Sequence, residues 1–181
     1  FKGYENYLTG ETAFPNQTYP TNTGRIELYY EDLLDLGLAF PEYETPEEAY
    51  RENPKANEFP LMFVQGKSRY RIHAYYSAST WFQEYFGPVV NINPEDAEAR
   101  GIATGDDVRI WNDRGEFVCT ALVNNSIMPG SLFMAETTYS QYYKEGFLQN
   151  VTNAYRQERC YDMKFGPQIP FNDTLVEMKK A

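Results

Sequence analysis

Cysteine and histidine are scarce in this sequence. Its 181 residues include two cysteines, Cys119 and Cys160, and one histidine, His73. Two cysteines without CxxC spacing cannot by themselves form a zinc or iron–sulfur site. One histidine without a serine or cysteine in a recognisable motif gives no nucleophile–base triad, so we predict no catalytic and no metal-ligating residue. Cys119, in the alternating run FVCTALV, is expected to be a small buried side chain or, alternatively, half of a disulfide with Cys160.

Positive charge and long apolar runs are scarce as well. Lysine and arginine total 16 against 26 acidic residues, which gives a net charge of −10. This balance excludes nucleic acid and an anionic membrane surface as the main partner. No apolar run approaches the roughly 20 residues that cross a bilayer, so we expect no direct membrane insertion. The chain opens with Phe1 and without a leader-like segment, so we expect it to be a piece of a longer protein.

Aromatic side chains, in contrast, are abundant. They make up 17% of the residues, with 16 tyrosines and 12 phenylalanines. This content is too high for a disordered chain and is typical of a packed domain with aromatic surfaces. A chain of this length buries roughly 70% of its unfolded surface, so a substantial core is expected.

Two parts are predicted from the pattern of turns and apolar runs: an N-terminal arm over residues 1–57, and a β-barrel with a C-terminal tail over residues 58–181. In the arm, residues 29–36 are expected to form a helical turn that ends at Gly37. The capping box Thr45-Pro46-Glu47-Glu48 predicts a second helix, which ends before Pro54. The tail is expected to close with a strand around the run TLVEM.

Short strands at close spacing dominate residues 58–139 and predict a compact barrel instead of a parallel α/β sheet. Asn93-Pro94 is expected to cap a helix that closes with Arg100 and a left-handed Gly101. The turn Asn112–Gly115 is expected to join two strands of a hairpin. The other predicted elements are strands at 61–64, 89–93 and 131–135 and a short helix at 80–86.

A cluster of positive charge interrupts this acidic chain. Residues 1–58 contain 12 acidic and 4 basic residues, whereas residues 59–90 contain Lys67, Arg69 and Arg71 against Glu84 alone. The three cations lie in the loop that follows the first predicted strand and opens with Gly66. The loop is either a solvated strand end or a binding site for an anion.

The order of these motifs resembles a known domain. The features are Asn93-Pro94-Glu95-Asp96-Ala97, Arg100-Gly101-Ile102, Gly105-Asp106, Asn112–Gly115 and Pro129-Gly130, preceded by Thr23-Gly24-Arg25-Ile26-Glu27 and followed by Asn150-Val151-Thr152. Together they are similar to the domain that ends the catalytic subunits of the dimethyl sulfoxide reductase family of molybdopterin oxidoreductases. The resemblance implies a mainly β fold, a double-psi β-barrel with short helices, an N-terminal arm and a C-terminal tail.

The resemblance also implies a cofactor, molybdopterin guanine dinucleotide, which holds molybdenum or tungsten in the full-length parent. The residues that it implies as cofactor-binding are Gln65, Gly66, Lys67, Ser68, Arg69, Arg71, His73, Tyr75, Ser77, Asp113 and Asn150.

Each of these residue types suits such a ligand. A glycine lets the backbone approach the ligand closely, and arginines donate charge-assisted hydrogen bonds to it. His73 stands where the family has His-Ser, and Tyr75 or Ser77 takes the place of that serine. Asn150 is expected to bind pterin edge atoms. The Asn112–Gly115 turn is assigned mainly to folding, with Asp113 as a further candidate contact for the guanine. The alternatives are a structural role for His73 and a turn or cap role for Asn150.

The chain is therefore expected to bind cofactor without turning over substrate, and to retain no metal when isolated. Alanine substitutions at Arg69 and Arg71 are expected to weaken cofactor retention with little effect on domain stability. The implied partners are the remaining domains of the parent catalytic subunit, together with an iron–sulfur electron-transfer subunit. The alternative function is a stand-alone β-barrel module for protein interaction or carbohydrate binding, in which exposed Tyr and Trp stack on the partner.

Overall fold

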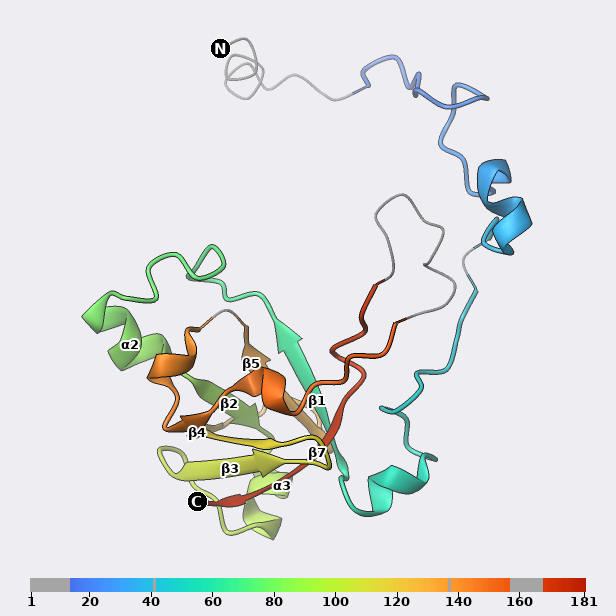
Figure 1. The fold of residues 1–181 in the computed structure, drawn as a ribbon. Helices are drawn as coiled ribbons and strands as arrows, with labels where there is room; N and C mark the ends of the chain where they lie inside the picture. The colour runs from blue at the N-terminus through green and yellow to red at the C-terminus, as the bar shows by residue number, and fades with distance from the viewer. Residues whose placement is uncertain (1–13, 41, 137, 157–167) are drawn as a thin grey trace. The chain divides into compact units, whose positions relative to one another are not determined.

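The computed structural model describes residues 14–40, 42–136, 138–156 and 168–181 (Figure 1). The chain forms two units, residues 1–43 and 44–181. In the first unit, the 3-10 helix η1 (Glu31–Leu36) ends at Gly37, which has a φ of 70° and donates its N–H to Leu34 O. The predicted helical turn is therefore confirmed. Residues 44–57 belong to the same unit as the barrel.

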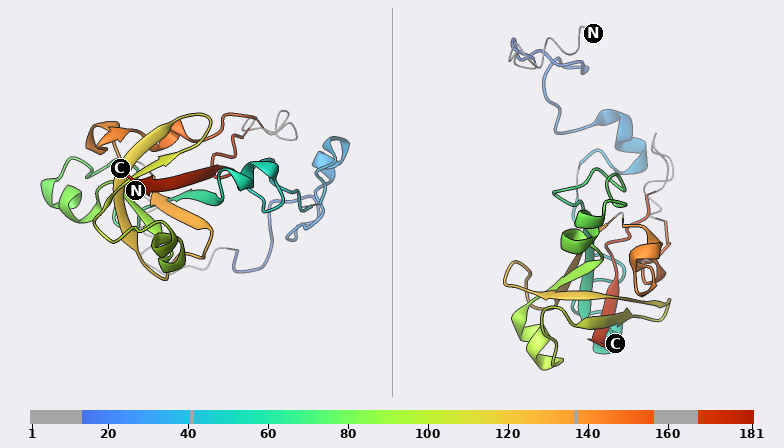
Figure 2. Two further views of the ribbon diagram at one scale, coloured as in Figure 1. Left: turned by 90° about the horizontal axis from the view of Figure 1, so that it is seen from below. Right: turned by 90° about the vertical axis from the view of Figure 1, so that its left-hand side faces the viewer.

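The second unit is built on one closed sheet. Its strands are β1 (Leu61–Gly66), β2 (Val89–Ile92), β3 (Asp107–Trp111), β4 (Glu116–Val123), β5 (Ser131–Ala135), β6 (Glu145–Gly146) and β7 (Leu175–Lys180). Their order is β2-β5-β1-β7-β3-β4-β6, and β2 also pairs with β4, which closes six strands into a ring. Figure 2 shows β7, in red, running between β1 and β3.

Two of the strand pairs, β1 with β5 and β2 with β4, are parallel, and the others are antiparallel. A parallel pair needs a crossover connection, so the chain crosses the barrel twice instead of winding around it as a meander. This topology is the predicted double-psi β-barrel.

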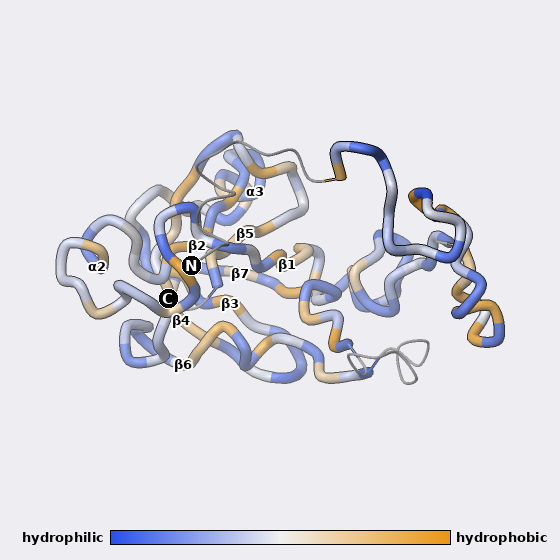
Figure 3. The backbone as a smooth tube through the Cα atoms, turned by 90° about the horizontal axis from the view of Figure 1, so that it is seen from above, coloured by the Kyte–Doolittle hydropathy of each residue, from blue (hydrophilic) through white to orange (hydrophobic). Residues whose placement is uncertain are grey.

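The core lies inside the ring. Alternate residues of the strands point inward, and Figure 3 shows hydrophobic segments along them. The largest fully buried side chains are Phe63, Phe117, Leu61, Ile92, Ile110, Leu132, Met134, Leu148, Met178, Val90, Val108 and Val151. Each such side chain contributes roughly 1.5–3 kcal/mol. Cys119 is buried among them, as predicted, and burial raises the pKa of its thiol to about 12. Cys160 lies outside the described residues.

Several locally coded elements are confirmed. The helix α3 (Pro94–Ala99) begins after Asn93, whose Oδ1 accepts from Glu95 N at 2.9 Å, and Gly101 has a φ of 63°. The helix α2 is Thr80–Phe86. The β3–β4 hairpin turns with a hydrogen bond from Asn112 N to Gly115 O. Among the described residues, no helix is both long and apolar enough to span a bilayer.

The helix predicted from the capping box is wrong. Residues 45–53 contain no helix, and the 3-10 helix η2 (Pro54–Asn57) begins where the predicted helix was expected to end. The backbone N–H groups of Glu47, Glu48 and Ala49 donate to the carboxylate of Asp173, at 2.8, 3.1 and 2.5 Å. A carboxylate distant in sequence therefore binds the N–H groups of this segment, and the chain bends around it.

Candidate functional site

The predicted basic loop lies at one end of the barrel. It comprises residues 67–79, between β1 and α2, and is here called the β1–α2 loop (Figure 1). Because β1 and β5 are parallel, with Gly66 opposite Ala135, their carboxyl ends meet at the same edge. Glu136 and Thr138, which follow β5, therefore lie against the loop.

Arg71 fastens the loop to the segment that follows β5. It is only 8% exposed. Its Nη1 donates to Ser77 Oγ at 3.2 Å and to Thr138 Oγ1 at 2.7 Å, and its Nη2 donates to Glu136 O at 3.1 Å. Burial lowers the pKa of Arg71, although a guanidinium stays charged in proteins. The Arg71 head group thus makes structural contacts that the sequence did not predict.

Lys67 contacts both Glu136 and His73. Lys67 Nζ lies 2.5 Å from Glu136 Oε1 and 3.4 Å from His73 Nδ1. An ammonium group can only donate, so Nδ1 accepts and the neutral imidazole carries its proton on Nε2. His73 and Tyr76 have φ values of 50° and 69°, a left-handed region that non-glycine residues rarely adopt. Such conformations persist where the surrounding structure imposes them, and they cluster at functional sites.

The other predicted residues of the loop have simpler surroundings. Ser68 Oγ accepts from Tyr70 N at 3.2 Å. Arg69 and Tyr75 are exposed. At Gly66, a Cβ would lie 2.7 Å from Cε2 of Phe133, so the close neighbour that requires a glycine is the ring of the adjacent strand.

Gln65, near the end of β1, lies just before the β1–α2 loop and contacts Gln149, the neighbour of Asn150 in the chain. Its side chain is buried, its N–H donates to Asn172 Oδ1 at 2.7 Å, and its Oε1 accepts from Gln149 Nε2 at 3.2 Å. Its Nε2 has no hydrogen-bond partner among the residues that the structure describes. A buried donor of this kind is uncommon, and a bound ligand or water is its usual explanation.

Asn150 lies beside Gln149 on the 3-10 helix η4 (Leu148–Asn150). Its Nδ2 donates to Glu116 O at 3.1 Å. The β3–β4 turn packs closely against it, because a Cβ on Gly115 would lie 2.9 Å from Asn150 O. Asn150 therefore lies against the β3–β4 turn, next in the chain to Gln149, whose side chain contacts Gln65 near the end of β1.

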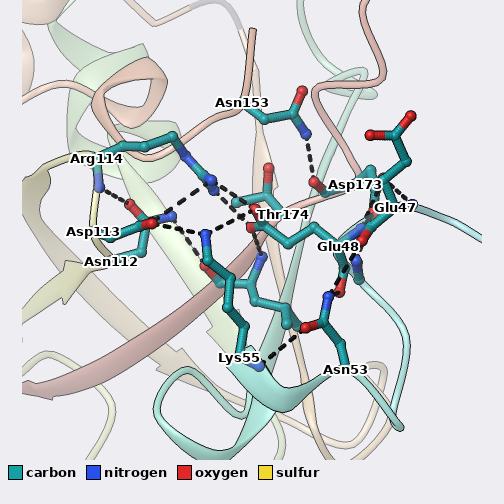
Figure 4. A network of polar contacts seen from close by, with 12 residues as sticks. Glu47, Glu48, Asn53, Lys55, Asn112, Asp113, Arg114, Asn153, Asp173 and Thr174 are labelled. Carbon is teal, nitrogen blue, oxygen red and sulfur yellow. Dashed lines mark hydrogen bonds and ion pairs between the residues drawn. The ribbon is translucent and has the colours of Figure 1, made fainter. Parts of the chain in front are cut away.

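Asp113 belongs to a separate polar network, drawn in Figure 4. Its carboxylate lies 2.7 Å from Lys55 Nζ, and the hydrogen bond to Lys55 lowers its pKa. Neighbouring Arg114 forms a two-pronged pair with Glu48, at 2.6 and 2.7 Å. Burial by itself raises the pKa of Glu48, but Arg114, the N–H of Leu175 and Lys55 together lower it below its ordinary value.

The Asp113 carboxylate, a predicted contact for the guanine, thus already forms an ion pair with Lys55, which would compete with the ligand. Sequence reasoning did not single out Glu136, Thr138 or Asp173, and it assigned Glu48 to a helix cap instead of an ion pair. The only sequence signal at Glu136 is its position after a predicted strand.

The donor set suits an anionic ligand with heteroaromatic edges. The guanidinium of Arg69 and the imidazole of His73 lie on the β1–α2 loop, and the side-chain amides of Gln65 and Gln149 meet near the end of β1. Guanidinium groups match phosphate oxygens, and amides match the donors and acceptors of a fused ring. Within the described residues, no group of three or more potential ligands is placed to bind a metal ion.

The fold is a double-psi β-barrel, and its β1–α2 loop carries polar and charged side chains. The Molydopterin dinucleotide binding domain family matches residues 61–161, and the chain belongs to this family. It is 33% identical over 173 residues to the putative dimethyl sulfoxide reductase catalytic subunit of Halobacterium salinarum, a match that covers 90% of this chain and 20% of that protein. It is also 33% identical over 169 residues to the probable oxidoreductase YoaE of Bacillus subtilis, covering 93% of this chain and 23% of the relative.

Among solved structures, acetylene hydratase from Pelobacter acetylenicus matches with a TM-score of 0.68 over 91% of this chain and 25% of the other, at 17% identity, which shows the shared fold. The chain spans about a fifth of the length of the two curated relatives described above. These findings confirm the predicted family, fold and cofactor, molybdopterin guanine dinucleotide. The chain is a cofactor-binding domain, and a stand-alone interaction or carbohydrate-binding module is not favoured.

Proposed function

We propose that this chain is the cofactor-binding part of a longer molybdopterin oxidoreductase. The family match over residues 61–161 carries the proposal, because that range includes both the β1–α2 loop and Asn150. When bound, the cofactor supplies a molybdenum or tungsten redox centre. The residues of this chain bind and orient it, and the substrate is turned over only with the rest of the longer protein.

Arg69 is the residue that we assign to the phosphate oxygens. Lys67 and Arg71 already contact Glu136 and its neighbours, whereas Arg69, in the same loop, is exposed. A charge-assisted hydrogen bond contributes roughly 1.5–3 kcal/mol. Gln65, Ser68, His73, Tyr75, Ser77 and Asn150 are proposed as neutral contacts along the rest of the ligand. Asp113 is proposed for the guanine, in competition with Lys55, and Gly66 for close backbone approach.

The test is Arg69→Gln in the longer protein. We expect at least a tenfold loss of bound cofactor at limiting supply, because the lost interaction exceeds about 1.4 kcal/mol. The measurement is the guanine nucleotide released by acid from purified protein. Arg109→Gln is the matched control, since Arg109 is a cation of β3 that pairs with Glu116 and Glu145. Equal cofactor content in both variants would contradict the proposal and favour the alternative that the loop is a solvated strand end.

The remaining domains of the longer protein are the proposed partners at this end. Six large side chains of the β1–α2 loop and α2 are exposed: Tyr70, Ile72, Tyr75, Tyr76, Trp81 and Tyr85. Exposed apolar patches of this kind mark interaction surfaces. We expect protease sites in residues 67–85 to be cleaved in the 181-residue chain and protected in the longer protein. Cleavage at the same rate in both would contradict this.

We also propose that the longer protein has a separate partner, an iron–sulfur electron-transfer subunit. The support is the family resemblance, together with the names of two relatives. One is a catalytic subunit from Halobacterium salinarum, and the other is the alpha subunit of the perchlorate reductase of Dechloromonas aromatica. Such names imply further chains in those relatives. Co-purification of the longer protein with a protein that contains iron is the expected result.

A further inference from the structure

We propose that Glu136 is a positioning residue of the cofactor loop, which acts through Lys67 to fix His73. The inference rests on the proposed function of the β1–α2 loop. Glu136 follows β5 and lies outside the set of cofactor-binding residues predicted from the sequence.

All three polar groups of Glu136 contact this region. Its N–H donates to Gly66 O at 2.9 Å, and its carbonyl accepts from Arg71 Nη2 at 3.1 Å. Its carboxylate, 17% exposed, lies 2.5 Å from Lys67 Nζ. One residue thus contacts the start of the loop, its first cation and its buried arginine.

The carboxylate determines where the Lys67 ammonium lies. Lys67 is 67% exposed, and a lysine stem with that exposure has many rotamers of similar energy. The ion pair with Glu136 selects those in which Nζ also reaches His73 Nδ1, at 3.4 Å. Glu136 therefore contacts Lys67, and Lys67 in turn contacts His73.

The consequence for His73 is chemical. With Nδ1 accepting from Lys67, the neutral ring keeps its proton on Nε2 and presents a donor on its other edge. Glu136 thereby sets which hydrogen-bonding group the loop offers to an acceptor atom of the ligand.

The histidine provides a direct readout, because it is the only one in the sequence. Its two ring nitrogens can be observed by ¹⁵N NMR in the 181-residue chain at pH 8.5, about two units above the ordinary histidine pKa. In the unmodified chain we expect Nδ1 to resonate as an unprotonated nitrogen and Nε2 as a protonated one. In Glu136→Gln we expect both signals to move toward each other, as in a ring that exchanges between tautomers.

The control is Glu177→Gln. Glu177 is also partly buried and pairs with an arginine, Arg100, at 2.7 Å, near α3 at the other end of the barrel (Figure 1). The Glu177→Gln substitution should leave the imidazole signals of His73 unchanged. If Glu136→Gln fails to fold, Lys67→Met removes the same contact and leaves the backbone hydrogen bonds of Glu136 in place. Imidazole signals that stay unchanged in the folded variants would overturn the proposal.

Cofactor content separates this inference from the proposed function. In the longer protein, Glu136→Gln should lower the released guanine nucleotide about two- to fivefold, the range expected for a partly exposed ion pair. An altered imidazole with unchanged cofactor content would support the positioning contact and contradict the assignment of His73 as a cofactor contact. Increased cofactor content would contradict the positioning role, because Glu136 would then be competing with the ligand for Lys67.

Discussion

Glu48 joins three separate segments of the barrel unit. Its side chain is 11% exposed, accepts both prongs of Arg114, and accepts from Leu175 N at 2.8 Å. Lys55 lies 3.4 Å from it. A carboxylate this enclosed is stabilising only while its partners are present, because an uncompensated buried charge is costly.

We therefore expect Glu48→Gln to lower the free energy of unfolding by about 2–4 kcal/mol at pH 7, measured by urea denaturation. Asp107→Asn, which removes an exposed pair with Lys144, should cost about 0–1 kcal/mol. If the two variants lose similar free energy of unfolding, burial of the Glu48 ion pair adds nothing to its contribution to stability.

The same substitution should change the pH dependence of stability. The pKa of Glu48 is lowered on folding from 4.5, so its contribution is complete above the unfolded value and disappears as the pH falls through the lower folded value. Between pH 7 and pH 3 the unmodified chain should lose more stability than Glu48→Gln. Parallel pH profiles would contradict the lowered pKa.

At the scale of elements, the β1–α2 loop is held by β5 through Arg71. The expectation that Arg71→Ala leaves domain stability nearly unchanged does not agree with these contacts, since the guanidinium is buried and binds three acceptors. The Arg69 side chain, by contrast, is exposed. Two arginines separated by one residue thus have different surroundings.

We expect Arg71→Ala to lower the free energy of unfolding by about 1–3 kcal/mol, because its acceptors lose their donor. Arg71→Lys should recover little of this, since an ammonium lacks the planar fork that reaches several acceptors. Arg69→Ala is the matched control and should change stability little. Hydrogen exchange of residues 66–79 measures the local effect, and equal exchange in all three variants would contradict the anchoring role.

At the scale of the whole molecule, residues 44–57 are an integral part of the barrel unit. Ala49 packs with Phe59 and Leu175 in a buried cluster, against partly buried Ala56 and Trp111. In the first unit, by contrast, Ala39 is the only buried apolar residue among those described in 14–40 and 42–43.

This division predicts the outcome of truncation. A chain of residues 44–181 should unfold with nearly the urea midpoint of the full chain. A chain of residues 58–181 lacks Glu48, the partner of Arg114, and also lacks the N–H groups of residues 47–49 that bind the Asp173 carboxylate. It should therefore lose about 3–5 kcal/mol. Equal stability of the two truncated chains would place the boundary after residue 57.

The sequence by itself determined the elements whose coding is local. The Asn93-Pro94 cap, the left-handed Gly101 and the Asn112–Gly115 turn each depend on hydrogen bonds and dihedral preferences within a few residues. Their order was sufficient to indicate the family and, through it, the barrel and the cofactor.

Only the tertiary structure decided which distant groups meet. Asp173 lies 126 residues from Glu47, and Arg71 lies 67 residues from Thr138, so no local pattern indicates either contact. The capping box at Thr45 is a valid local signal, yet Asp173 binds the N–H groups of that segment. Closure of the barrel places the ends of β1 and β5 side by side, and this parallel pairing makes Glu136 the neighbour of Lys67.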